Sequence, residues 1–125
     1  KISKFIIKKY KINKKNILGH SDIAPLRKID PGEKFPWKLL SKNKIGIWHN
    51  INSRKTKTFR NKISEPNLVK FINLLKKIGY RIEYSKSNQL KKLIKIFQMR
   101  FRPELVNGKL DFECYMIAKS LYNLK

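Results

Sequence analysis

The chain has 125 residues, of which 31 are lysine or arginine and 8 are aspartate or glutamate, so its formal net charge is +23. Hydrophobic residues make up 41% of the sequence, which is enough for a packed core and excludes a fully disordered chain. No apolar run reaches the roughly eighteen residues that a membrane-spanning helix requires.

The positive charge taken alone favours an anionic polymer, such as a nucleic acid, as partner. The excess consists of 25 lysines and only 6 arginines, however, and proteins that read base edges rely on arginine. A lysine-rich and isoleucine-rich composition is also typical of AT-rich genomes, so a functional basic face and a genomic bias both remain open. We expect no nucleic-acid partner.

The first predicted element is an amphipathic helix over residues 2–10, in which Ile2, Phe5 and Ile6 recur at helical spacing. We expect this helix to pack on a sheet. A turn rich in lysine and asparagine then leads into a short strand at residues 17–18.

The stretch from Gly19 to Trp37 cannot be one regular element, because four helix-breaking residues are spread along it: Pro25, Pro31, Gly32 and Pro36. A loop that follows a strand is a common place for a functional site. This loop carries four side chains suited to metal or acid–base chemistry: His20, Asp22, Lys28 and Asp30.

Imidazole and carboxylate groups are both good zinc ligands, and catalytic zinc keeps three protein ligands and one open position for water. His20 and Asp30 are therefore candidate zinc ligands, and Lys28 is a candidate for stabilising developing negative charge. We interpret Asp22 as a support of the loop that accepts backbone N–H bonds. Taken singly, these residues also fit a packed histidine and an ordinary Asp-Pro-Gly turn.

The run His-Ser-Asp-Ile-Ala-Pro, followed by Arg-Lys, Asp-Pro-Gly and Phe-Pro-Trp, resembles the zinc-dependent N-acetylmuramoyl-L-alanine amidases, whose superfamily includes the peptidoglycan recognition proteins. The resemblance implies that His20 and Asp30 are two of three protein ligands of Zn²⁺. It implies that Lys28 stabilises the oxyanion of the tetrahedral intermediate. It also implies that Pro25 and Arg27 face the peptide stem of the substrate.

Three features depart from the family pattern, and one of them, Ile29 in place of a commonly small or polar residue, lies between two site positions and removes no ligand. Leu26 stands where the family usually has glycine, so the turn is strained if its backbone requires a positive φ. The family's first zinc histidine and its catalytic glutamate lie upstream of the loop, and no residue before His20 matches them. We therefore expect the chain to be the C-terminal part of a longer enzyme. His49 follows the loop and matches no family ligand.

A short helix is predicted at residues 38–42, and residues 45–48 complete the catalytic remnant. The polar, charged residues 51–64 have the composition of a linker. Three short amphipathic helices are predicted beyond it: 65–78, 87–101 and 110–124. The first of them is expected to bury one apolar face: Leu68, Val69, Ile72, Leu75 and Ile78.

The three-helix segment resembles the peptidoglycan-binding module on the residues Ile78-Gly79-Tyr80, Phe97-Gln98 and the Asn-Gly-Lys-Leu-Asp run at 107–111. We interpret Tyr80 and Gln98 as structural. The single cysteine, Cys114, lies in an apolar helical pattern, which predicts a buried thiol that is neither a nucleophile nor part of an internal disulfide.

Together these elements predict an α+β fold. Residues 1–50 are expected to form the remnant of a mixed-sheet zinc amidase domain, residues 51–64 a linker, and residues 65–125 a small three-helix bundle.

The predicted function is zinc-dependent hydrolysis of the bond between N-acetylmuramic acid and L-alanine, by a truncated bacterial enzyme held on peptidoglycan by its C-terminal module. The expected location is the cell envelope or periplasm, and the expected state is a monomer. One alternative is a catalytically inactive peptidoglycan-binding protein. Another is a basic nucleic-acid-binding domain, which leaves the pattern of the loop unexplained.

Overall fold

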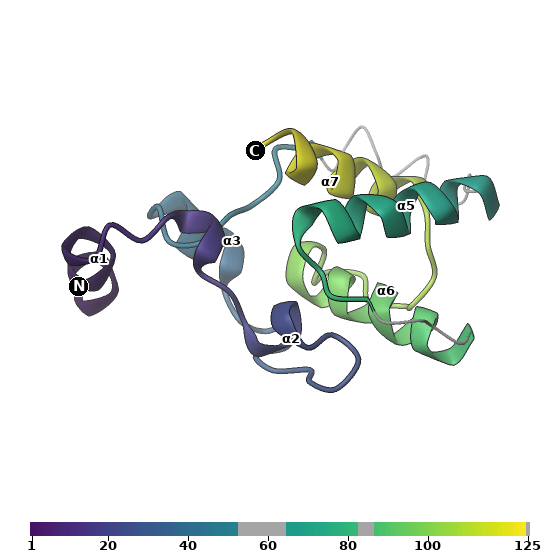
Figure 1. Ribbon diagram of the computed structural model, residues 1–125, viewed down its shortest axis with the longest axis horizontal. Coiled ribbons are helices and arrows are strands. Elements are labelled where there is room, and N and C mark those ends of the chain that lie inside the picture. Colours follow the sequence, from purple (N-terminus) through teal and green to yellow (C-terminus); the bar gives the residue numbers. More distant parts are fainter. Residues whose placement is uncertain (53–64, 83–86, 125) are drawn as a thin grey trace.

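The structure is a computed structural model that describes residues 1–52, 65–82 and 87–124. Every regular element in these ranges is a helix (Figure 1): α1 (Ile2–Lys9), the 3-10 turn η1 (Lys14–Asn16), α2 (His20–Ile23), α3 (Trp37–Lys42), α5 (Glu65–Ile78), α6 (Ser87–Phe101) and α7 (Phe112–Asn123). None of these helices combines the length and hydrophobicity that crossing a bilayer requires.

The expected α+β class is wrong for the described part of the chain, because it contains no sheet. The segment proposed as a strand is indeed extended, with φ −94° and ψ 101° at Ile17. A strand exists only when its backbone is paired in a ladder, and no second strand lies in the described ranges. Residues 45–48 are likewise without regular structure.

Helix α1 forms as its periodicity predicts, but it does not pack on a sheet. None of its residues is buried. Its apolar side chains stay in solvent instead, with Ile2 77%, Phe5 65% and Ile6 40% exposed. In Figure 1 this helix lies at the end of the molecule that is farthest from α5–α7.

The three predicted C-terminal helices are present, and α5 and α7 lie side by side over α6 (Figure 1). Their buried side chains form one core: Phe71, Leu75, Leu93, Ile94, Ile96, Phe97, Phe101, Cys114, Ile117, Ala118 and Leu121. The face predicted for the first helix is rotated, since Phe71 is fully buried and Val69 is 61% exposed.

The N-terminal part packs directly on the helical unit, because α2 and α3 both contact α6. A hydrogen bond adds to this contact, because the Lys92 ammonium group donates to the backbone carbonyl of Leu26 at 2.8 Å. Most of the predicted linker falls outside the described residues.

Candidate functional site

The loop that carries the candidate ligands begins with one turn of helix, α2, whose N-cap is Gly19. Asp22 closes this turn, because its Oδ2 accepts a 2.8 Å hydrogen bond from the Gly19 N–H. The predicted role of Asp22 as a support of the loop is confirmed. The strain considered for Leu26 is absent, since Lys11 and Lys44 are the only non-glycine residues of the described ranges with a positive φ.

The loop brings His20 and Asp30 together. The Nδ1 atom of His20 lies 3.3 Å from Oδ2 of Asp30. The backbone holds the two residues in place, because the Ser21 N–H donates a 2.9 Å hydrogen bond to the Asp30 carbonyl. Both side chains are open to solvent, at 51% and 63% exposure. The two atoms are therefore close to each other and accessible from outside.

This donor pair fits part of a zinc site. Two ligands that each lie about 2.0–2.1 Å from one tetrahedral zinc ion lie roughly 3.3 Å from each other. The observed separation of Nδ1 and Oδ2 is 3.3 Å, and both ligand types are ones that zinc accepts. Within the described ranges no cluster of three or more histidine, cysteine or acidic side chains is present. His20 and Asp30 could therefore hold two of the three protein positions that a catalytic zinc ion needs.

The other three predicted site residues lie on the turn after α2. Arg27 and Lys28 are exposed, and their backbone N–H groups both donate to the Ala24 carbonyl, at 3.0 and 2.9 Å. Pro25 is fully buried beneath them. The side chains of Arg27 and Lys28 are therefore accessible from solvent, whereas the Pro25 ring is not.

His49 is engaged in the packing between the two parts of the chain. Its Nε2 lies 3.0 Å from the Phe101 carbonyl, and its Nδ1 accepts a 3.3 Å bond from the Ile51 N–H. An acceptor at Nδ1 requires the neutral tautomer with the proton on Nε2. Burial accordingly lowers the pKa of His49, as does Lys38 to a smaller extent.

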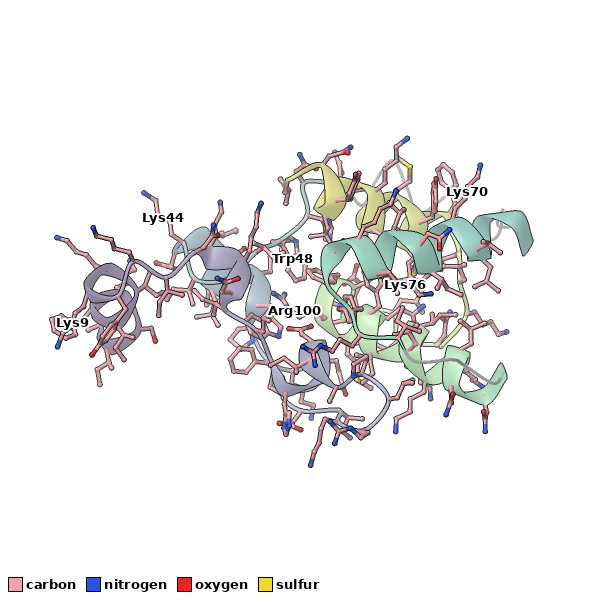
Figure 2. The ribbon with its side chains drawn as sticks, in the orientation of Figure 1. Lys9, Lys44, Trp48, Lys70, Lys76 and Arg100 are labelled. Carbon is pink, nitrogen blue, oxygen red and sulfur yellow. The ribbon has the colours of Figure 1, made fainter. Side chains whose placement is uncertain are left out.

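Sequence reasoning missed the residues that fix Asp22 from the other side. The Tyr80 hydroxyl donates to Asp22 Oδ1 at 3.3 Å, and Arg100 Nε donates to Asp22 Oδ2 at 3.3 Å. Figure 2 shows Arg100 between the N-terminal part and the helical unit. Arg100 lies in the last turn of an amphipathic helix, where a cation is usually exposed. Its burial could therefore not be predicted from the sequence.

A cavity of about 340 Å³ lies beside this contact, between the η1–α2 segment and the helical unit. Its lining includes Leu18, Asp22, Tyr80 and Arg100. Burial raises the pKa of Tyr80 well above its usual value, and the neighbouring Asp22 carboxylate raises it further. The phenol therefore keeps its proton and acts as a donor to Asp22.

Two proteins to which the chain is similar in sequence are N-acetylmuramoyl-L-alanine amidases, the class that the loop resembles. No protein-family model matches the chain. It is 35% identical over 122 residues to the N-acetylmuramoyl-L-alanine amidase AmiD of Escherichia coli (strain K12), a match that covers 96% of this chain and 44% of AmiD. It is 53% identical over 38 residues to the 1,6-anhydro-N-acetylmuramyl-L-alanine amidase AmpD of Haemophilus influenzae (strain ATCC 51907 / DSM 11121 / KW20 / Rd), which covers 30% of this chain and 21% of AmpD.

Solved structures give the same result. The E. coli AmiD complex with anhydro-N-acetylmuramic acid-L-Ala-D-gamma-Glu-L-Lys has a TM-score of 0.84 at 32% identity, covering 98% of this chain and 49% of that one. AmpDh3 of Pseudomonas aeruginosa has a TM-score of 0.82 at 32% identity, covering 98% of this chain and 50% of that one. This chain therefore spans about half the length of AmiD and of AmpDh3.

Proposed function

We propose that this chain is part of a zinc-dependent enzyme that hydrolyses the amide bond between N-acetylmuramic acid and L-alanine in peptidoglycan, since it is similar in sequence and in structure to AmiD. The observation that carries the proposal is the 3.3 Å approach of His20 Nδ1 to Asp30 Oδ2 on an exposed loop. The sequence of that loop resembles the zinc-site motif of these amidases.

His20 and Asp30 are proposed to hold the zinc ion. Bound zinc lowers the pKa of its water ligand to about 7 and polarises a carbonyl group. Lys28 is exposed two positions before Asp30, so its ammonium group can approach the negative charge that develops on the substrate oxygen. Arg27 is proposed to bind a carboxylate of the peptide stem. Pro25 was expected to face the peptide stem as well, but its side chain is fully buried in this chain.

The third ligand and the general base are proposed to come from polypeptide upstream of Lys1, which makes this chain the C-terminal part of the enzyme. Support comes from the match to AmiD, which covers 96% of this chain but only 44% of AmiD, so that relative has further polypeptide. Exposed apolar side chains on the N-terminal part add to it, since Ile23 is 55%, Ile29 60% and Leu39 60% exposed. Such residues are typical of a surface that another segment covers.

We also propose that α5–α7 form a module that keeps the enzyme on peptidoglycan. A tether raises the local concentration of substrate without new catalytic contacts. The proposed substrate is peptidoglycan or a muropeptide, the proposed location is the cell envelope or periplasm, and the proposed state is a monomer.

The test measures zinc content and release of peptide from a purified muropeptide, by this chain and by a version extended upstream. We expect the extended protein to be active, and His20→Ala or Asp30→Ala to abolish both zinc binding and hydrolysis. Lys28→Met is expected to lower kcat by about 10²–10³-fold while zinc stays bound. Lys34→Met, which removes an exposed cation from the same loop, is the matched control and should keep full activity. Undiminished hydrolysis by Asp30→Ala would contradict the proposal.

A second candidate is a peptidoglycan-binding protein without hydrolytic activity. It is favoured by the finding that the described ranges supply two candidate ligands and no cluster of three. It predicts sedimentation with purified peptidoglycan that is unaffected by a chelator and by Asp30→Ala. Absence of both zinc and hydrolysis in the extended protein, together with retained sedimentation, would select this candidate over the enzyme.

A further inference from the structure

We propose that Arg100, on α6 of the helical unit, is a positioning residue for the loop that carries His20 and Asp30. It acts through Asp22 and Trp37 and touches neither candidate ligand. The helical unit would then maintain the geometry of the site, besides any part in holding the protein on its substrate. The inference rests on the proposed function in one respect, namely that His20 and Asp30 bind zinc. Whether Arg100 holds the loop in place can be tested without metal.

The first step is the carboxylate of Asp22, whose side chain is only 7% exposed. Its Oδ2 accepts from the backbone N–H of Gly19, the residue directly before His20, at 2.8 Å. The same oxygen accepts from Arg100 Nε at 3.3 Å, and Oδ1 accepts from the Tyr80 hydroxyl at 3.3 Å. One buried carboxylate thus joins the backbone next to a candidate ligand to two side chains of the helical unit.

The second step is the guanidinium of Arg100, whose side chain is 2% exposed. Its carbon Cζ lies 3.8 Å from the centre of the Trp37 ring, which is a close cation–π contact. Its Nη2 donates a 3.2 Å hydrogen bond to the Ile47 carbonyl. Arg100 therefore contacts both Asp22, at the start of the loop, and Trp37, at its end.

The third step is the packing at the base of the loop. A Cβ atom added to Gly19 would lie 2.7 Å from Cδ of Pro31 and 3.2 Å from Cζ2 of Trp37, so these groups already touch the Gly19 backbone. Gly19 precedes His20 and Pro31 follows Asp30. A shift of Trp37 or of the Gly19 backbone would therefore move the two candidate ligands relative to each other.

The charges explain why this contact is sensitive to Arg100. Removing one partner of a buried ion pair leaves the other charge buried and uncompensated. Burial lowers the pKa of Arg100, and the Asp22 carboxylate opposes that shift. The 3.3 Å bond from the Asn50 N–H to Ser120 Oγ also joins the two parts, but neither of its residues lies in the loop.

The test compares Arg100→Gln and Tyr80→Phe with the matched control Ser120→Ala in the full 125-residue chain. The first readout is hydrogen exchange of the Gly19 and Ser21 amides, which bond to Asp22 and to the Asp30 carbonyl. We expect Arg100→Gln to speed exchange at both amides by about 10-fold or more, since local opening sets these rates. Tyr80→Phe should give a smaller increase, and Ser120→Ala a change below about two-fold, with the α5 and α7 amides unaffected.

The second readout is the dissociation constant for Zn²⁺ alone, measured by calorimetry. Loss of a group that orients metal ligands typically weakens metal binding by about 10–100-fold, and we expect a change in this range for Arg100→Gln only. Unchanged Gly19 and Ser21 exchange in a folded Arg100→Gln protein would overturn the inference. If Arg100→Gln fails to fold, unchanged exchange in Tyr80→Phe decides against it. If the wild-type chain alone binds no Zn²⁺, the exchange data decide on Arg100, and absence of Zn²⁺ from the version extended upstream would count against the proposed function.

Discussion

Arg102 Nη1 donates hydrogen bonds of 2.8 and 2.6 Å to the two carboxylate oxygens of Asp111. The arginine side chain is fully buried and the aspartate is 7% exposed. Asp111 is also the N-cap of α7, because its Oδ1 accepts a 2.9 Å bond from the Cys114 N–H. The pair therefore ties the end of α6 to the start of α7.

Asp111→Ala should destabilise the protein by about 3–5 kcal/mol, because it leaves the Arg102 charge buried without its main partner. The measurement is urea denaturation followed by circular dichroism. Glu104→Ala removes an exposed acid from the same connection and should change the free energy of unfolding by less than about 0.5 kcal/mol. Equal urea midpoints for Asp111→Ala and the wild type would contradict this role of the pair.

Gln98→Leu should destabilise the turn before α7. The Gln98 Oε1 atom accepts from the Asn107 and Gly108 N–H groups at 3.0 and 2.8 Å, and its Nε2 donates to the Lys109 carbonyl at 2.9 Å. Leucine keeps the volume but leaves these groups unpaired, at a loss of about 2–4 kcal/mol. Asn73→Leu, on the exposed face of α5, is the control. A loss no larger than that of the control would show that water replaces the amide.

Cys114 should resist alkylation in the folded protein. The side chain is completely buried, and burial raises the pKa of its thiol to about 12. Since the thiolate is the reactive form, we expect iodoacetamide at pH 8 to label the native chain at least about 100-fold more slowly than the urea-unfolded chain. Similar rates in both states, measured by mass spectrometry, would mean that the helical unit opens readily.

The stability of the protein should decrease in mild acid through His49. Burial and Lys38 lower the pKa of His49 from 6.5, and the Phe101 carbonyl and Glu104 oppose this only in part. Below about pH 6.5 the unfolded chain therefore binds more protons at this site than the folded chain does, so the free energy of unfolding falls as the pH drops from 6.5 through the folded pKa.

The measurement is urea denaturation at pH 7 and pH 5.5. His49→Gln removes the titration and keeps a side-chain N–H that can reach the Phe101 carbonyl. The variant should lose less stability than the wild type between the two pH values. An equal loss in both proteins would assign the acid sensitivity to other groups.

The helices could be predicted because their signals are local. Apolar spacing locates α1 and α6 to within one residue. The pairing of His20 with Asp30 was likewise expected from a motif that lies within one loop. Information carried by a short stretch of chain was sufficient for these features.

The sheet and the contact around Arg100 depend on distant partners, and these were not predictable. Ile17 has the extended backbone of a strand, but the described ranges contain no strand with which it could pair. Arg100 lies 78 positions from Asp22, and helical periodicity ranks an arginine as a surface residue. Only the folded chain shows that this cation belongs to the interior.

The buried ion pairs also affect the charge of the protein surface, because they remove acidic side chains from it. Within the described ranges three acidic residues, Asp22, Asp111 and Glu113, are buried. Exposed lysines lie on α1, α3, α5, α6 and α7, and Figure 2 shows Lys9 and Lys70 among them. The outer field is therefore dominated by lysine and extends about 10 Å in 0.1 M salt. At low ionic strength the protein should adhere to any polyanion whatever its chemistry, and only binding that persists near about 0.15 M salt reports recognition of peptidoglycan.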